Sequence, residues 1–234
     1  MAERLGPSWA EPVVLEADDL TPRSDLAAVV ALLEAHHPPD AEQAATVERM
    51  LTFAADHPDA LHRSCTAGHF TGSALVVDPG SRRVVLLFHT KLRRWLQPGG
   101  HADGDGNMAG TAWREATEEI GIEGLRVVLP PIDLDIHEIP AGKDPAHLHL
   151  DIRFLVLAPI GARVVGNHES ESIRWVSESE LVDLGADRGL RRLTERGLAL
   201  VPRVPGLEGW AVSPPGRARH ERRWPPPDSS TPST

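Results

Sequence analysis

The sequence predicts an α/β or α+β fold in which helices cover a mixed sheet. Short runs rich in β-branched and apolar residues alternate with segments whose apolar residues recur at helical spacing. Both kinds of segment occur within one chain of 234 residues, which is long enough for one well-buried domain with additions at its ends. Such a mixture is typical of a sandwich of helices on a sheet.

Residues 1–66 predict a helical N-terminal extension that packs on the main domain or leads into it. The first twenty residues contain Pro, Gly and acids without a clear period, so we expect them to be loosely ordered. Apolar residues at helical spacing over 26–33 predict a helix that ends at the His-His-Pro-Pro sequence. Asp40 as N-cap, with Gln43 at the capping-box position, predicts a second helix.

From residue 70 the pattern changes to that of strands, and residues 67–200 predict the main domain. Two β-rich runs separated by Asp-Pro-Gly-Ser predict a hairpin, and a short strand then leads into a glycine-rich loop. Asn107 is a suitable N-cap for the helix that follows. The expected strands are 73–77, 83–88, 95–96, 125–138 (interrupted by Pro130 and Pro131), 147–157 and 173–176, and the expected helices are 107–120, 178–184 and 188–198. Residues 201–234 are rich in Pro, Arg and Ser and predict a disordered tail.

Composition excludes several classes of protein. No run of eighteen apolar residues is present, and acids stand where a signal peptide needs an apolar core. The single cysteine, Cys65, forms no internal disulfide and suits a reducing cytoplasm. The excess of Arg over Lys, with abundant Ala and Pro, resembles the usage of GC-rich bacterial genomes. A net charge of −10 disfavours nucleic acid as a partner, although bound dications would still allow an anionic substrate.

The helix over 107–120 carries the strongest chemical signal. Glu115, Glu118 and Glu119 share one side of it, while alanines and Ile120 form another side that suits a core, and Gly121 ends it. Two of these acids lie in the last turn, where the helix dipole favours cations instead. A solvated face with ordinary charge pairs is one explanation. A bound divalent cation is the other, and we favour it because local rules tend to break at functional sites.

These residues resemble the signature of the Nudix hydrolases, G-x5-E-x7-R-E-U-x-E-E-x-G-U, in which U is a bulky aliphatic residue. Ala116 is a small version of the first U, and Gly106 replaces the first signature glutamate. The matching positions are Gly100, Arg114, Glu115, Glu118, Glu119, Gly121 and Ile122. The resemblance implies an α/β/α sandwich with a mixed, partly closed sheet. It also implies an enzyme that cleaves a nucleoside diphosphate linked to another moiety with Mg²⁺ or Mn²⁺.

The resemblance also implies roles for the residues of this signature, Gly100 to Ile122, which we call the box. Glu115 and Glu119 would be the principal metal ligands, with Glu118 beside them and the Gly100 carbonyl completing the set. Hard dications prefer such oxygen ligands, and the box lacks the Cys and His ligands of a zinc site. Arg114 would hold the carboxylates in place through an ion pair, with Glu118 in reach at i+4.

Two parts of the expected site stay open. Asp103 or Asp105 would replace the carboxylate missing at Gly106, or both are turn residues. The general base lies within the box, or is Glu169 or Glu171 in a later loop.

The strand over 147–157 shows one polar and one apolar face at its start. His147, His149 and Asp151 would line the substrate site, and the His-x-His spacing also suits a second metal. The alternative is a half-solvated strand with ordinary hydrogen bonds. Arg94, in the basic segment before the box, would reach a substrate phosphate or is simply solvated.

Two other functions fit parts of the pattern. A diphosphate isomerase of the related kind would need a dedicated cysteine and a histidine metal site, and Cys65 lies outside the expected context. A nucleotide-binding regulatory module without catalysis would fit the loss of the first glutamate, but the intact Arg-Glu and Glu-Glu pairs disfavour it. The sequence does not decide the substrate or the oligomeric state, a homodimer included.

Overall fold

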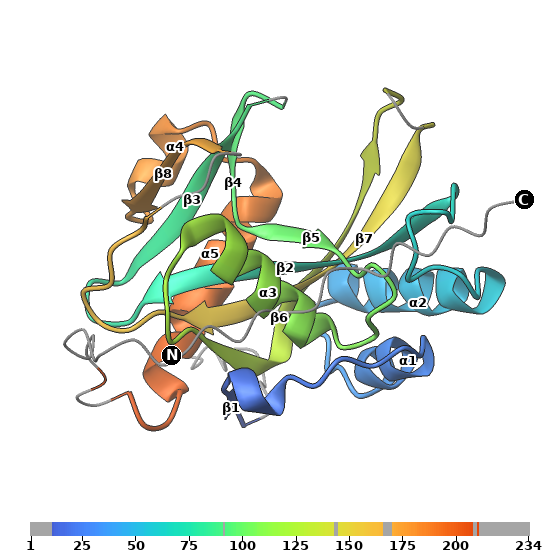
Figure 1. The fold of residues 1–234 in the computed structure, drawn as a ribbon, viewed down its shortest axis with the longest axis horizontal. Helices are drawn as coiled ribbons and strands as arrows, with labels where there is room; N and C mark the ends of the chain where they lie inside the picture. Colours follow the sequence, from blue (N-terminus) through green and yellow to red (C-terminus); the bar gives the residue numbers. More distant parts are fainter. Residues whose placement is uncertain (1–10, 91, 143–144, 166–169, 208–209, 211–234) are drawn as a thin grey trace, which may run out of the picture.

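The computed structural model describes residues 11–90, 92–142, 145–165, 170–207 and 210 (Figure 1). In this part of the chain eight strands form one mixed sheet, in the order β1-β6-β7-β2-β3-β4, with β5 paired to β2 and β8 paired to β3. The β2–β7 ladder is parallel and the others are antiparallel. The strands are β1 (Val13–Leu15), β2 (Gly68–Asp78), β3 (Arg83–His89), β4 (Arg94–Leu96), β5 (Gly99–His101), β6 (Arg126–Ile139), β7 (His147–Leu157) and β8 (Ser170–Val176).

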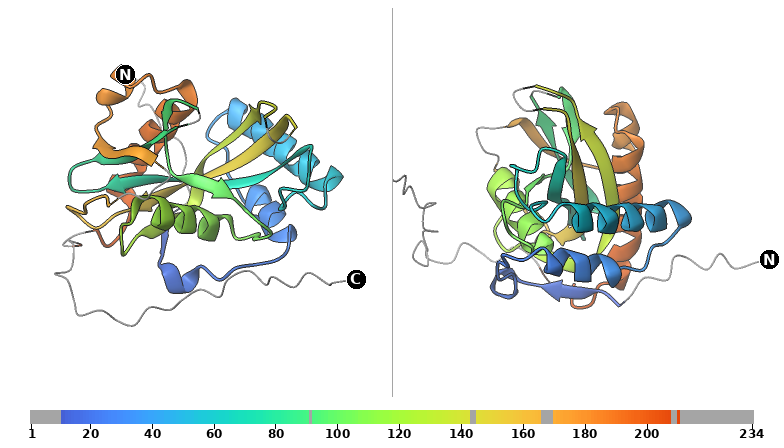
Figure 2. Two further views of the ribbon diagram at one scale, coloured as in Figure 1. Left: turned by 45° about the horizontal axis from the view of Figure 1, so that its top comes forward. Right: turned by 90° about the vertical axis from the view of Figure 1, so that its right-hand side faces the viewer.

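Helices cover both faces of the sheet, which confirms the predicted sandwich. On one face, α3 and the two N-terminal helices pack against Phe70, Ala74 and Val76 of β2. On the opposite face, α5 packs against Leu75 and Val77 of the same strand. Figure 2 shows α3 and α5 on opposite sides of the strands. The helices are α1 (Ala27–Glu34), α2 (Ala41–Asp56), α3 (Met108–Ile120), α4 (Glu180–Asp183) and α5 (Arg188–Leu200), with short 3-10 turns η1 (Ala17–Asp19) and η2 (Val201–Arg203).

Helix α3 begins and ends where its capping residues predict. The Asn107 side chain accepts a hydrogen bond from the Gly110 N–H at 3.1 Å, and Gly121 ends the helix in the left-handed conformation at φ 64°. A glycine on β2 lets the helix approach the sheet closely. A Cβ at Gly72 would lie 2.9 Å from the Met108 carbonyl oxygen and 3.0 Å from Thr111. The helix is therefore held at a short distance from β2 and from β5 beside it.

Helix α2 is joined to the sheet by the side-chain amide of Gln43, which bonds the backbone of β6 as a neighbouring strand would. Asp40 is the N-cap as predicted, because its side chain accepts from the Gln43 N–H at 2.8 Å. The predicted capping box is wrong, however, since the Gln43 side chain points away from the helix start. Its amide donates to the Leu134 carbonyl and accepts from the Leu134 N–H, both at 2.9 Å. These bonds satisfy part of β6 beyond the segment that β1 covers.

The N-terminal segment contributes to the sheet itself. Val13, Val14 and Leu15 form β1 and pair antiparallel with β6. The expectation of loose order for the first twenty residues is therefore wrong for this segment, while residues 1–10 lie outside the described part. A three-residue strand between prolines and acids carries too little periodicity to be detected in the sequence.

The remaining elements agree with the sequence except at some of their ends. Strand β2 begins at Gly68, five residues before the predicted start, and α4 is shorter than expected. The β6–β7 register shifts between Val128 and Asp133, where the two prolines interrupt the predicted strand. None of the helices in the described part combines the length and apolar character needed to cross a bilayer. Of the predicted tail, residues 208–209 and 211–234 lie outside the described residues.

A buried network of charges fixes α5 to the sheet. Asp133 of β6 is fully buried and accepts hydrogen bonds from Arg153 of β7 and from Arg192 and Arg196 of α5. Burial opposes the charge on Arg153. The nearby carboxylates of Asp151, Asp135 and Asp133 outweigh this effect and raise the pKa of Arg153. Removing one member of such a network would leave the others uncompensated.

Candidate functional site

Two box glutamates converge on neighbouring residues of β5. A Cβ built on Gly100 would lie 2.3 Å from the Glu115 carboxyl group, so the carboxylate occupies the space that a side chain would fill. The Glu119 carboxylate accepts a hydrogen bond from the Gly99 N–H at 3.1 Å. Gly100 lies opposite Gly72 in the β2–β5 ladder, and both glycines face α3. The glycine pair therefore brings the acidic side of the helix against β5.

Arg114 makes an ion pair within the box, but with Glu115 and not with the predicted Glu118. Its Nη2 atom donates to the His101 carbonyl and to Glu115 Oε1, both at 2.8 Å. The predicted pairing with Glu118 is replaced by this contact with the adjacent glutamate. The bond to His101 pulls the guanidinium toward β5, and Glu115 points the same way. Arg114 thus connects Glu115 to strand β5.

Glu118 lies on the exposed side of α3. In the part of the chain that the structure describes, the three box glutamates do not bring their oxygens within 4.8 Å of one another. Glu115 and Glu119 are nevertheless directed at adjacent β5 residues. Their carboxylates and the backbone oxygen of a residue without a side chain form a donor set suited to a hard dication.

At Gly106, where the signature has its first glutamate, the Arg23–Asp25 segment fills the space of a side chain. The Gly106 N–H donates to the Arg23 carbonyl, and a Cβ at Gly106 would lie 2.2 Å from the Asp25 carbonyl oxygen. The segment before α1 therefore crosses directly over this residue. A glutamate side chain has no room there while the N-terminal segment keeps its place.

Asp103 and Asp105 both have structural partners. Asp103 receives two hydrogen bonds from Arg63, at 2.7 and 2.8 Å, and these bonds lower the pKa of its carboxyl group. Asp105 accepts from the N–H groups of Arg23 at 2.9 Å and of Asn107 at 2.8 Å. These contacts support the turn interpretation of both residues over replacement of the missing carboxylate.

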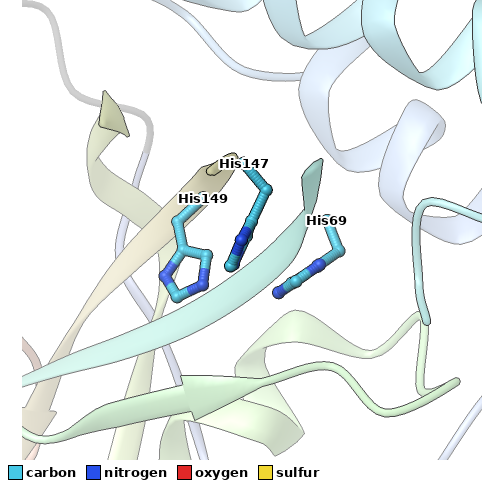
Figure 3. A group of neighbouring side chains, drawn as sticks. All are labelled: His69, His147 and His149. Atoms are coloured by element: carbon cyan, nitrogen blue, oxygen red, sulfur yellow. The ribbon is translucent and has the colours of Figure 1, made fainter. Parts of the chain in front are cut away.

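A cluster of histidines lies on the face of the sheet opposite α3. His69 of β2 is the register partner of His149 of β7, and His147 is two residues away on the same face of β7. The ring centroids of His69 lie 4.9 Å from His147 and 5.0 Å from His149. Figure 3 shows the three rings turned toward a shared space. His101 and His137 stand at the margin, 5.0 and 5.5 Å from the His149 ring.

Burial keeps several of these imidazoles neutral. It is the main reason that the pKa of His101 falls to about 4 and that of His149 to about 2. The same cause lowers the pKa of His69, which is only 3% exposed. Neither ring nitrogen of His69, nor Nε2 of His149, makes a hydrogen bond of normal geometry. Neutral rings with unused lone pairs can accept hydrogen bonds or ligate metals, but they do not offer positive charge to a phosphate.

Asp151 bonds side chains other than the two histidines that alternate with it. The residue is 2% exposed, and its carboxylate accepts from Thr71 at 2.9 Å, Ser73 at 2.8 Å and Arg153 at 2.6 Å. These bonds occupy it within the charge network that holds α5. The sequence placed Asp151 with the substrate-binding residues, and the structure gives it a supporting position instead.

The other predicted residues lie apart from this cluster. Arg94 is on β4, and its ion pair is with Asp187 at the start of α5, 3.6 Å away with both side chains more than half exposed. Glu169 lies outside the described residues. Glu171 belongs to β8 by its backbone, while its side chain lies outside the described part.

Three histidines of the cluster were missed in the sequence: His69, His101 and His137. A signal was present for two of them. Polar residues alternate with apolar ones from His69 to Ser73, and again from Asp133 to His137, as on half-buried strands. His101 follows the glycine pair directly and carries no pattern of its own. Bringing the strands together requires their register, which the sequence does not state.

Comparisons with known proteins agree with the box. A family model described as NUDIX domain matches residues 69–197, which is more than half of the chain. A comparison with curated proteins found no match.

Several solved structures are similar to part of the chain. The dihydroneopterin triphosphate pyrophosphohydrolase of E. coli is 17% identical, with a TM-score of 0.47 over 56% of this chain and 94% of that one. An Ap4A hydrolase of C. elegans is 17% identical, with a TM-score of 0.47 over 57% and 97%. A NUDIX-family hydrolase of Clostridium perfringens is 18% identical, with a TM-score of 0.44 over 57% and 96%.

Proposed function

The chain belongs to the Nudix family of pyrophosphohydrolases, and we propose that it uses Mg²⁺ or Mn²⁺ to split a nucleoside diphosphate linked to another moiety. The observation that carries the proposal is the convergence of Glu115 and Glu119 on Gly100 and Gly99. A bound dication there would neutralise phosphate charge and lower the pKa of an attacking water.

Each box residue has a role in this proposal. Glu115 and Glu119 hold the cation together with the Gly100 carbonyl, and the exposed Glu118 stands beside them on the solvent side. Arg114 positions Glu115 by bonding it and the His101 carbonyl with the same nitrogen. The general base in this proposal is either a glutamate of the box or one of Glu169 and Glu171, the same alternatives that the sequence indicates.

The substrate would extend from the box toward the histidine-bearing face of the sheet. His147 and His149 are half-buried and accessible there, and we propose that they contact the ligand. Arg94 remains a proposed phosphate contact from β4. Asp151 is left out, because its carboxylate is buried and occupied by other side chains.

The division of the chain follows the same proposal. Residues 67–200 would form the catalytic domain, with residues 1–66 as an N-terminal extension and 201–234 as a tail. The way the Arg23–Asp25 segment covers Gly106 supports an extension that is part of the folded enzyme. Cysteine and Arg usage support a cytoplasmic, bacterial setting.

A substrate panel tests the activity. Purified protein is incubated with Mg²⁺ or Mn²⁺ and nucleoside triphosphates, dinucleoside polyphosphates, nucleotide sugars and dinucleotides, and released phosphate and nucleoside monophosphate are measured. Glu119→Gln should lose at least about a hundredfold in kcat/KM. Glu195→Gln, which makes the same change on an exposed position of α5, should keep wild-type activity. Equal turnover by both variants would refute the role of the box.

The alternative functions predict other results on the same panel. A regulatory module would bind a nucleotide without turning it over. An isomerase would need a reactive cysteine, but Cys65 is 4% exposed and burial raises the pKa of its thiol. The structure of this residue therefore disfavours the isomerase.

A further inference from the structure

We propose that His69, His147 and His149 form a second metal site, which binds one transition-metal dication of the Zn²⁺ kind. The site is separate in chemistry and position from the carboxylates of the box, and it does not depend on the proposed hydrolysis. One potential ligand nitrogen of each residue lies within 4.8 Å of those of the other two (Figure 3).

The backbone explains why these three rings meet. Strands β2 and β7 run parallel and adjacent, so register partners His69 and His149 point to the same face. His147 follows at the two-residue spacing that keeps it on that face, with its ring centroid 5.2 Å from that of His149. An ion held by the three rings would have zinc–nitrogen distances of about 2.0–2.1 Å.

The unused nitrogens are the second observation that indicates a ligand. Buried polar groups in folded proteins nearly always have a partner. His69 is 3% exposed, and neither of its ring nitrogens makes a hydrogen bond of normal geometry, nor does Nε2 of His149. A packed cluster of aromatic rings would explain the stacking distances, but it would leave these nitrogens unsatisfied. A metal ion would bind the free nitrogens of His69 and His149. His147 Nδ1 bonds the Pro145 carbonyl at 2.8 Å, which leaves its Nε2 for the same ion.

The donor set selects the metal. Imidazole nitrogens suit Zn²⁺ and its transition-metal neighbours, whereas Mg²⁺ prefers oxygen. Three histidines would leave a coordination position for water or a substrate oxygen, as in catalytic rather than structural zinc sites. His147 and His149 are only partly buried, so an ion can enter from that side.

Strand β5 lies between the two sites. Its Gly100 faces Glu115 on α3, while the next residue, His101, places its ring 4.9 Å from His69 on the other face. The His101 carbonyl also accepts the bond from Arg114. An ion at the histidines would therefore sit across one strand from the box.

Zn²⁺ binding to the intact chain tests the proposal directly. After chelator treatment, Zn²⁺ is titrated against a chromogenic chelator in excess Mg²⁺, which keeps the oxygen site occupied. Wild-type protein should bind Zn²⁺ at this site, and His147→Gln and His149→Gln should each weaken binding by about a hundredfold or more. This exceeds the roughly 10–100-fold cost of losing an outer-shell partner. His37→Gln, which removes an exposed histidine before α2, should bind as wild type does.

Two further variants separate this site from others that hold Zn²⁺. Cys65→Ser tests the neighbouring group formed by His57, Asp59 and Cys65, and Glu119→Gln tests the box. Both should retain the tight site. Loss of Zn²⁺ binding in either one, with binding unchanged in His147→Gln and His149→Gln, would overturn the proposal.

The Co²⁺-loaded protein provides a readout that folding defects do not imitate. Its visible absorption should show a four- or five-coordinate site in the wild type and lose it in His149→Gln, with equal far-ultraviolet circular dichroism for both. The same spectrum in both proteins would contradict the assignment. Because no nucleotide is used, an inactive enzyme would leave this result unchanged.

Discussion

At the scale of single residues, the glycines of β5 set the geometry of the box. Gly100 is needed because the Glu115 carboxyl group lies where its Cβ would be. The obstacle is the end of a flexible side chain, so an added methyl group would move Glu115 rather than unfold the protein. A substitution at Gly100 would therefore impair the site without lowering the stability of the fold.

Gly100→Ala should therefore lower kcat/KM by about a hundredfold, the scale of a 1 Å displacement at an active site. The free energy of unfolding, measured by denaturant titration, should change by less than about 1 kcal/mol. Gly142→Ala is the control, because a Cβ there meets nothing within 4 Å. Unchanged catalysis in Gly100→Ala would show that Glu115 does not need this cradle.

Gly106 behaves differently, because its obstacle is backbone. Restoring the signature glutamate with Gly106→Glu would place a Cβ 2.2 Å from the Asp25 carbonyl oxygen. We expect a loss of about 1–3 kcal/mol in unfolding free energy, as for other overpacked positions, and no gain in activity. Gly142→Glu adds the same side chain in open space and should leave stability unchanged. A more active and equally stable Gly106→Glu protein would contradict this explanation of the departure.

The box could be read from the sequence because its residues are close together along the chain. Spacing of three and four on a helix fixes which side chains share a face without any tertiary information. The partner of Arg114 and the reason for Gly106 could not be read in this way. One depends on the His101 carbonyl and the other on the Arg23–Asp25 segment, more than eighty residues earlier in the chain.

At the scale of elements, side chains of two helices satisfy buried polar groups of the sheet. The Gln43 amide of α2 bonds both the N–H and the carbonyl of Leu134 on β6. The two arginines of α5 close the charge network around the fully buried Asp133. Helix α2 and helix α5 are thereby fixed to the same strand from different sides.

Gln43→Ala should destabilise the protein by about 1–3 kcal/mol, because buried backbone groups at Leu134 would lose their partner. Denaturant unfolding measures the change. Glu48→Ala, on an exposed position of the same helix, should change it by no more than about 0.5 kcal/mol. If the two variants are equally stable, the amide does not anchor α2.

Periodicity located most helices and strands but not their neighbours. Strand β7 was predicted with its observed bounds because its alternation is long and regular. Strand β1 has three residues, and β2 was predicted too short because His69 and Thr71 were not counted as the polar half of an alternation. The parallel β2–β7 pairing brings His69 to His149 across eighty residues, and no local pattern encodes it.

At the scale of the whole molecule, buried neutral histidines couple stability to pH. His36, between α1 and α2, is 6% exposed, and burial is the main cause that lowers its pKa to about 4. Arg196 and His37 are the charged or titratable groups that add to the shift. Since the unfolded chain takes up a proton near pH 6.5 and the folded one does not, stability should be full above that pH and fall toward pH 4.

Each such histidine contributes a slope of up to about 1.4 kcal/mol per pH unit within this window. His36→Gln should therefore flatten the dependence of unfolding free energy on pH between 6.5 and 4. His62→Gln, which removes an exposed histidine that does not contribute to the shift of His36, should leave the slope as it is. A wild-type slope in His36→Gln would show that this ring does not resist protonation in the fold.

The central claim is that the carboxylates of α3 hold a hard dication against β5. Electron paramagnetic resonance of free Mn²⁺ during titration measures this binding without any substrate. Glu115→Gln and Glu119→Gln should each weaken Mn²⁺ binding at least about tenfold, while Glu195→Gln and His147→Gln should bind it as the wild type does. Equal Mn²⁺ affinity in the wild type and in the Glu115→Gln/Glu119→Gln double variant would contradict the claim.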